Sequence, residues 1–142
     1  MELGLKGKRA IVTGGSRGIG RAIALVLAAE EARVCVTARD EALLESAVSE
    51  IDAAGGEGMY VSADLTSLDE CKKVVDAAAE KFGGVDILVN VAGAAKGGDV
   101  LDIDTGFFDH ALGLKTYGYL RLAQLVVPHM KKNGWGRIIN IA

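Results

Sequence analysis

A glycine-rich turn near the start of the chain contains the residue types that could bind a phosphate group. The turn covers residues 13–20, with the sequence TGGSRGIG, and includes Gly14, Gly18 and Gly20. A β-branched run precedes it and a helix-forming run follows it. Unpaired N–H groups and the positive end of a helix dipole would therefore meet an anion there, which predicts pyrophosphate binding. A tight turn without a ligand is the alternative, because the glycine spacing departs from G-x-G-x-x-G.

Two later positions carry polar groups at the ends of predicted strands. Asp64, followed by Leu65, comes after the third strand, and its carboxylate can accept a hydrogen bond from an adenine amino group. Asn90 ends the fourth strand, and the small residues Ala92 and Gly93 would let the backbone approach a ribose. Asp64 could instead cap the next helix. Asn90 could also be a buried amide that joins two strands.

The end of the second predicted strand indicates which dinucleotide the chain would bind. A carboxylate there would take the ribose 2′-hydroxyl of NAD, whereas a guanidinium can pair with the 2′-phosphate of NADP. The strand ends in Ala38, Arg39 follows it, and Arg17 in the glycine-rich turn offers a second cation. Asp40 lies about twenty residues after the last glycine of the turn, where an NAD-binding carboxylate is sought. We interpret Asp40 as a helix N-cap, so the residues favour NADP over NAD.

Short β-branched runs alternate with longer segments of helical periodicity along the whole chain. The apolar centres of the short runs predict strands that are buried on both faces, as in a parallel sheet. Strands separated by helices predict right-handed βαβ units, and hence one α/β domain over residues 1–142 with a doubly wound, Rossmann-type parallel sheet. The predicted strands are residues 8–13, 33–38, 57–62, 85–90 and 137–141, and the predicted helices are residues 19–30, 40–54, 67–82 and 104–132.

Charge and composition argue against several classes of partner. The 142 residues carry a net charge of −3 with scattered basic residues, so we expect no nucleic-acid binding. No apolar signal region or membrane-spanning stretch occurs, so we expect a cytoplasmic protein without a membrane partner. Cys35 and Cys71 lack a CxxC neighbour, and His110 and His129 lack a metal-ligand neighbour. We therefore expect buried thiols, helical histidines and no metal site.

The three motifs together resemble the cofactor-binding part of the short-chain dehydrogenase/reductase family. The sequence at residues 13–20 resembles that family's T-G-x-x-x-G-I-G loop, Asp64-Leu65 resembles its adenine-contacting aspartate, and the sequence NVAG at residues 90–93 resembles its N-N-A-G motif. The resemblance covers the whole chain. It implies an oxidoreductase that transfers a hydride between a nicotinamide dinucleotide and a carbonyl or alcohol substrate, and that forms a homo-oligomer when intact. The implied cofactor-binding residues are Gly14, Ser16, Arg17, Gly18, Ile19, Gly20, Arg39, Asp64, Leu65, Asn90, Ala92 and Gly93.

The sequence also departs from the family's pattern. The resemblance implies that the fifth strand should lead into a catalytic serine and a helix with Tyr-x-x-x-Lys, and no Tyr-x-x-x-Lys occurs in the 142 residues. It also implies that the family's catalytic asparagine falls at Gly113, and that Glu31 replaces a glycine that commonly ends the first helix. We therefore assign no catalytic residue. We expect an incomplete domain, truncated before the catalytic helix, that is inactive alone and has an exposed fifth-strand edge.

Two other classes of protein compete with the oxidoreductase. A non-catalytic nucleotide-binding or interaction module would keep the glycine-rich turn without Tyr-x-x-x-Lys. A flavodoxin-like signalling domain has a similar length and five strands, but it does not explain the turn, Asp64 and Asn90 together.

Overall fold

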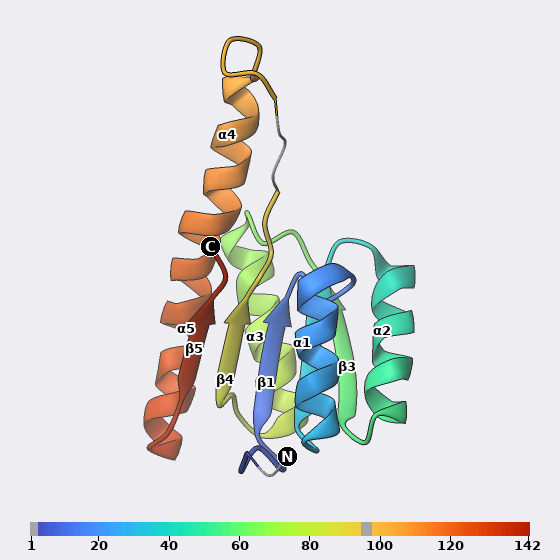
Figure 1. Ribbon diagram of the computed structural model, residues 1–142. Coiled ribbons are helices and arrows are strands. Elements are labelled where there is room, and N and C mark those ends of the chain that lie inside the picture. Colours follow the sequence, from blue (N-terminus) through green and yellow to red (C-terminus); the bar gives the residue numbers. More distant parts are fainter. Residues whose placement is uncertain (1–2, 95–97) are drawn as a thin grey trace.

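A five-stranded parallel sheet forms the centre of the protein in a computed structural model that describes residues 3–94 and 98–142 (Figure 1). The strand order is β3-β2-β1-β4-β5, and every neighbouring pair is parallel. The chain starts at β1, winds outward to β3, and then crosses to β4 on the other side of β1. This reversal confirms the predicted doubly wound α/β fold and creates a switch point between β1 and β4.

Helices and strands alternate as the apolar runs predict. The elements are β1 (Arg9–Thr13), α1 (Gly18–Ala29), β2 (Arg33–Ala38), α2 (Glu41–Ala53), β3 (Glu57–Ser62), α3 (Leu68–Phe82), β4 (Ile87–Asn90), α4 (Thr105–Leu112), the π-helix η1 (Gly113–Gly118), α5 (Tyr119–Asn133) and β5 (Arg137–Asn140). The predicted bounds of the first three helices and the five strands differ from these by two residues at most.

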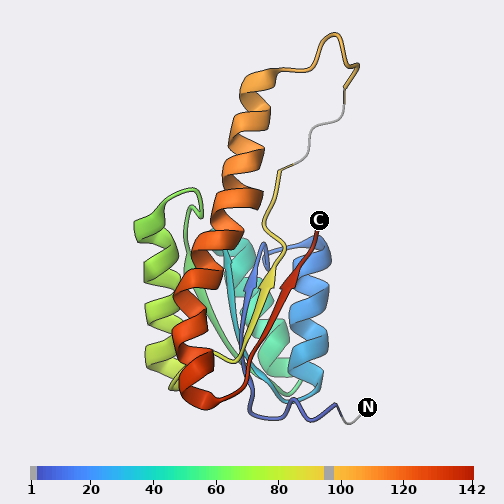
Figure 2. The same ribbon diagram turned by 90° about the vertical axis from the view of Figure 1, so that its left-hand side faces the viewer.

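The strands are apolar along their length because helices cover both faces of the sheet (Figure 2). Alternate side chains of one strand enter different cores. In β1, Ile11 packs with buried residues of α3 and α5, whereas Ala10 and Val12 pack with buried residues of α1 and α2. Cys35 and Cys71 are both buried and free, as expected, and burial raises the pKa of the Cys35 thiol to about 12.

The predicted long helical segment over residues 104–132 is confirmed as helical, but it consists of α4, η1 and α5 rather than of one regular α-helix. Helix α4 projects beyond the carboxyl edge of the sheet in both views, and α5 packs beside β5 and β4 (Figures 1 and 2). Between them, η1 carries glycines at both ends, Gly113 and Gly118. Glycine weakens the regular α-helix, and a π-helix has wider turns, so the helical register changes at η1. None of the helices in the described ranges is long and apolar enough to cross a bilayer.

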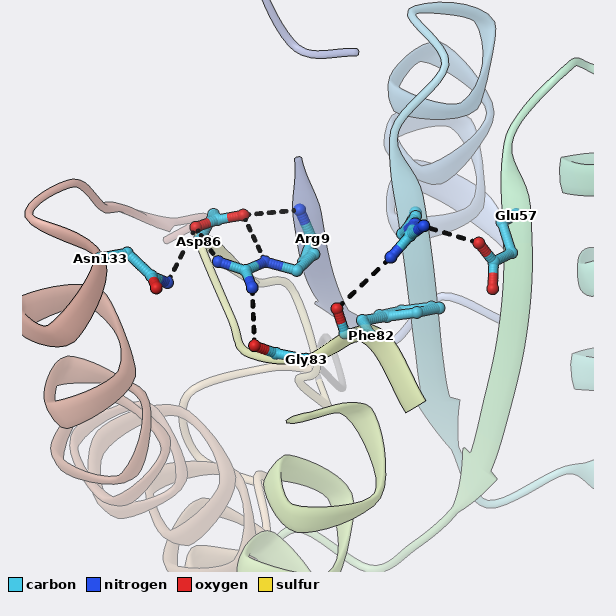
Figure 3. Close-up of polar contacts among 7 residues, drawn as sticks. Arg9, Glu57, Phe82, Gly83, Asp86 and Asn133 are labelled. Carbon is cyan, nitrogen blue, oxygen red and sulfur yellow. Dashed lines mark hydrogen bonds and ion pairs between the residues drawn. The ribbon is translucent and has the colours of Figure 1, made fainter. Parts of the chain in front are cut away.

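A buried ion pair joins the amino-terminal ends of β1 and β4, opposite the carboxyl edge of the sheet (Figure 3). The Arg9 Nε and Nη2 atoms donate to the two carboxylate oxygens of Asp86, each at 2.8 Å. The backbone N–H of Arg9 and the amide of Asn133 also donate to this carboxylate, at 3.0 and 3.2 Å. The third guanidinium nitrogen donates to the Gly83 carbonyl at 2.7 Å. One carboxylate therefore connects β1, the start of β4 and the end of α5.

Two further structural expectations are confirmed, one about Glu31 and one about the fifth strand. Glu31, after α1, has φ +59°, a left-handed conformation that favours glycine. Strand β5 is exposed along its length, with Ile138 and Ile139 exposed by 37% and 47%. Helices therefore cover the other four strands better than they cover β5.

Candidate cofactor site

A cleft of about 570 Å³ opens at the carboxyl edge of the sheet, next to the switch point between β1 and β4. All of the predicted site residues except Asn90 line it. Sequence reasoning missed several further lining residues. These are Leu43, Ala63, Val91, His110 and Leu114, while Ala38 and Asp40, which the sequence analysis placed where the dinucleotide is selected, also line the cleft.

The glycine-rich turn leaves the amino end of α1 open to this cleft. Arg17 occupies the N-cap position of α1 in an extended conformation and makes no side-chain capping hydrogen bond. The first N–H groups of α1, which include that of Ile19, therefore have no intrahelical partner and keep their capacity for an anion. Gly18, with φ +56°, has open space where a Cβ would be. An open helix end of this kind can accept an anion such as a phosphate group.

Close backbone packing explains two glycines of the turn. A Cβ on Gly20 would overlap the carbonyl of Gly14, and a Cβ on Gly14 would lie 3.1 Å from the Cα of Ala92. Gly14 also has φ +63°. The turn after β1 and the loop after β4 thus approach each other as only glycine allows.

Thr13 joins these two loops, a role that sequence reasoning missed. Its buried hydroxyl oxygen accepts hydrogen bonds from the backbone N–H groups of Val91 and Ala92, both at 2.9 Å. These bonds join residues 78 and 79 positions apart in the chain. A buried threonine at the end of a strand is the only local signal, and it does not identify the partner.

Asp64 lies in the part of the cleft next to β3. Its carboxylate accepts hydrogen bonds from the Thr66 hydroxyl at 2.7 Å and from the Thr66 backbone N–H at 3.0 Å. These bonds lower the pKa of Asp64, and the positive charge of Arg39 lowers it further. The alternative reading of Asp64 as a helix cap is wrong, because the Ser67 hydroxyl caps α3 by accepting from the Glu70 N–H. Asp64 is thus an exposed, ionised acceptor at neutral pH.

Two arginines lie at the edge of the same cleft. Arg17 and Arg39 are both exposed, and neither forms an ion pair with an acidic side chain in the described parts of the chain. The adjacent Asp40 caps α2 by accepting from the Leu43 N–H at 3.1 Å, which confirms the N-cap interpretation. A carboxylate engaged with a helix end competes less for a ribose hydroxyl, whereas the two guanidinium groups keep their donors for a phosphate.

Asn90 is fully buried at the end of β4. Its Nδ2 donates to the Oδ1 of Asn140 at 2.9 Å, so the amide does join two strands, β4 and β5. The Oδ1 of Asn90 has no hydrogen-bond partner among the described residues. Buried polar atoms seldom stay unpaired, so this oxygen can accept a bond from a ligand or a water molecule.

The helical residue that faces the ends of β4 and β5 is Lys115, whereas the resemblance placed the family's asparagine at Gly113. A Cβ on Gly113 would meet open space. The Lys115 Nζ donates to the Ile141 carbonyl at 2.9 Å, and its Cε would contact a Cβ on Gly93 at 2.6 Å. The assignment to Gly113 is therefore not supported by the geometry, and the turn of η1 presents Lys115 instead.

The comparisons with known proteins agree with this fold. The family model described as short chain dehydrogenase matches residues 8–142. The chain is 40% identical to the 7alpha-hydroxysteroid dehydrogenase of Escherichia coli K12, and the match covers 99% of this chain and 54% of that enzyme. The chain thus spans about half the length of this curated relative.

Solved structures show the same similarity. A short chain dehydrogenase from Mycobacterium thermoresistibile is 33% identical and superposes with a TM-score of 0.91 over 97% of this chain and 52% of its own. An NADH-dependent reductase in complex with NAD is 34% identical, with a TM-score of 0.85 over 96% of this chain and 60% of its own. The matched family model, the parallel sheet and the open helix end at its switch point lead to one conclusion: this chain belongs to the short-chain dehydrogenase family.

Proposed function

We propose that the cleft binds NADP(H), and that this chain forms the cofactor-binding part of an oxidoreductase acting on a carbonyl or alcohol. The observation that carries the proposal is the open amino end of α1 at the switch point of the sheet. Residues of the glycine-rich turn would hold the pyrophosphate, and Asp64 with Leu65 would contact the adenine. Ala92 and Gly93 would contact the ribose and nicotinamide half, and the buried Asn90 would support their loop through its bond to Asn140. When bound, the nicotinamide would supply a hydride to a carbonyl or accept one from an alcohol.

The preference for NADP depends on Arg17 and Arg39. Both arginines line the cleft, Arg39 directly after β2, where a dinucleotide's adenosine ribose would be held, and Ala38 supplies no competing carboxylate. A solved relative binds NAD, so family membership does not decide the preference. Bidentate pairing of a guanidinium with a 2′-phosphate would discriminate between the two cofactors.

Titration of this chain with NADPH and NADH, followed by calorimetry, tests the proposal. We expect tighter binding of NADPH. A hydrogen bond to a charged group contributes about 1.5–3 kcal/mol, so Arg39→Met should weaken NADPH binding by roughly tenfold to a hundredfold. It should change NADH binding by less than about twofold, because NADH has no 2′-phosphate to pair with the guanidinium. A matched control, Arg137→Met, removes an exposed arginine at the start of β5 and should change neither.

Two outcomes would contradict the proposal. Equal affinity for NADPH and NADH in the unsubstituted chain would contradict the NADP preference while leaving dinucleotide binding intact. Absence of binding to both would contradict the cofactor site itself. Binding without turnover of any carbonyl substrate, in a confirmed full-length product, would instead favour the non-catalytic nucleotide-binding module.

We also propose that the intact enzyme is a homo-oligomer that assembles through α4, η1 and α5. These helices expose large apolar side chains beyond what isolated surface positions need. Analytical ultracentrifugation of the intact enzyme over a range of concentrations tests this proposal. A monomer at every concentration would contradict it. The exposed residues are Phe108, Leu112, Tyr117 and Leu120.

A further inference from the structure

Lys115 is a half-buried cation packed against Gly93, a residue of the cleft wall, and none of the cofactor-binding motifs includes it. Its alkyl chain lies against the backbone of Gly93, which lines the cleft, because a Cβ on Gly93 would approach both its Cε and its Nζ. Its ammonium donates one hydrogen bond, to the Ile141 carbonyl at 2.9 Å. Tyr119, one turn later, donates to the same carbonyl at 3.0 Å. The positive charge is thus held at the carboxyl ends of β4 and β5.

No opposite charge neutralises this ammonium within the part of the chain that the structure describes. The ion pairs found there involve other cations, and the Lys115 Nζ lies 5.7 Å from the centre of the Tyr119 ring, a neutral neighbour. An ammonium has three donors, and one carbonyl occupies only one of them. The charge is therefore available to act on whatever occupies this end of the cleft.

The proposed binding mode determines which part of the cofactor lies there. The open end of α1 holds the pyrophosphate in the middle of the cleft. Asp64 and Arg39, which follow β3 and β2, lie on one side of it, and Gly93 and Lys115 lie on the other. A dinucleotide that crosses the switch point with its adenosine on the first side must place its nicotinamide on the second.

We propose that Lys115 makes the site discriminate between the redox states of the cofactor, and that it favours the reduced form. The oxidised nicotinamide ring carries a positive charge, whereas the reduced ring is neutral. A fixed ammonium on the same side of the cleft repels only the oxidised ring. Two like unit charges several ångströms apart, in a medium less polar than water but more polar than a protein interior, should weaken binding by about threefold to tenfold. The inference rests on the proposed function, and it makes Lys115 a determinant of specificity.

Binding constants for both redox states test this without any measurement of turnover. NADPH and NADP⁺ are titrated separately into the chain at pH 7 and fixed ionic strength, and the ratio of their dissociation constants is compared among variants. We expect Lys115→Met to reduce the preference for NADPH over NADP⁺ by about threefold to tenfold, because it removes the charge and keeps the alkyl chain. Lys115→Arg keeps the charge and should keep the preference.

Two matched controls show whether an effect comes from the charge of Lys115. One tests the hydrogen bonding to the Ile141 carbonyl, and the other tests the net charge of the chain. Tyr119→Phe removes the other donor to the Ile141 carbonyl without changing any charge. Lys132→Met removes an exposed lysine from the last turn of α5, the helix end that lies opposite the carboxyl edge of the sheet (Figure 1). Neither should change the preference. Far-ultraviolet circular dichroism checks that each variant folds, and Lys115→Gln replaces Lys115→Met if the latter does not.

The outcomes distinguish this inference from the proposed function. If the unsubstituted chain binds neither form, the proposed function fails and this inference fails with it. If both forms bind and Lys115→Met leaves the preference unchanged, this inference alone is overturned. It is also overturned if Tyr119→Phe or Lys132→Met reduces the preference as much, because the effect would then not come from the charge beside the nicotinamide.

Discussion

Replacing Asp86 with asparagine should destabilise the fold far more than removing a charge from an exposed ion pair. Asp86 is almost fully buried, with its side chain 6% exposed, and the Arg9 side chain is 18% exposed. The carboxylate accepts from two guanidinium nitrogens, one backbone N–H and one amide. Asp86→Asn keeps the shape of the side chain but leaves the Arg9 charge buried beside an amide that can point its own donors toward the guanidinium.

The expected magnitude follows from the burial of the pair. Removing one partner of a buried ion pair costs about 3–5 kcal/mol, because the remaining charge is uncompensated. The partial exposure of Arg9 and its remaining bond to the Gly83 carbonyl place the expected loss near the lower end, at about 3 kcal/mol. The exposed pair Arg33 and Glu57, with side chains 44% and 49% exposed, provides the contrast. Glu57→Gln should cost less than about 1 kcal/mol.

Equilibrium unfolding in urea, monitored by circular dichroism, measures both variants under identical conditions. A difference of about 2 kcal/mol between them, at an unchanged dependence on urea, is the expected result. If Asp86→Asn costs no more than Glu57→Gln, the reasoning is refuted. The pair would then contribute no more than a surface ion pair, despite its burial and its four hydrogen bonds. Figure 3 shows both pairs at this end of the sheet.

Three further changes should be measurable. Burial would raise the pKa of Asp86, but the bonds from Arg9 outweigh it and the pKa is lowered, so stability is fully present above the ordinary carboxyl pKa of about 4. This stability falls as the pH drops through the lowered pKa. In urea titrations below pH 4, Asp86→Asn should therefore lose less stability than the unsubstituted protein does. Glu31→Gly should stabilise the fold by about 0.5–1 kcal/mol in urea titrations, because it relieves the left-handed backbone and loses only the exposed pair with Lys6. Gly20→Ala should abolish NADPH binding in calorimetry, because its Cβ would overlap the Gly14 carbonyl.

The sheet could be predicted from the sequence because local and long-range preferences agree there. Strands β1 and β2 are β-branched and apolar, and the structure buries them between two helical layers, so a continuous apolar run was a sufficient signal. The positions of Gly14, Arg39, Asp64 and Gly93 in one cleft follow from the same logic. Each comes after a parallel strand, and the carboxyl ends of parallel strands share one edge.

Contacts between residues far apart in sequence could not be predicted in the same way. Thr13 and Asp86 are ordinary residues at the ends of predicted strands, and nothing nearby identifies their partners. Thr13 holds the loop after β4 through bonds across 78 and 79 positions, and Asp86 holds Arg9 across 77. Such bonds depend on register between strands that the crossover helices bring together. The side chain alone shows only that a polar group will need a partner once it is buried.

The fourth predicted helix shows how a small local change in geometry alters an assignment of function. The resemblance to the family placed its asparagine at Gly113 by matching a sequence motif, without any account of how the helix turns between residues 104 and 132. The structure interrupts the α-helix with η1, whose wider turns rotate the following side chains relative to those before it. Lys115 therefore reaches the ends of β4 and β5, while Gly113 has open space beside it. A lysine brings a charge where an asparagine would bring a neutral amide, so Lys115 adds an electrostatic effect at the nicotinamide end of the proposed site that the sequence motifs did not indicate.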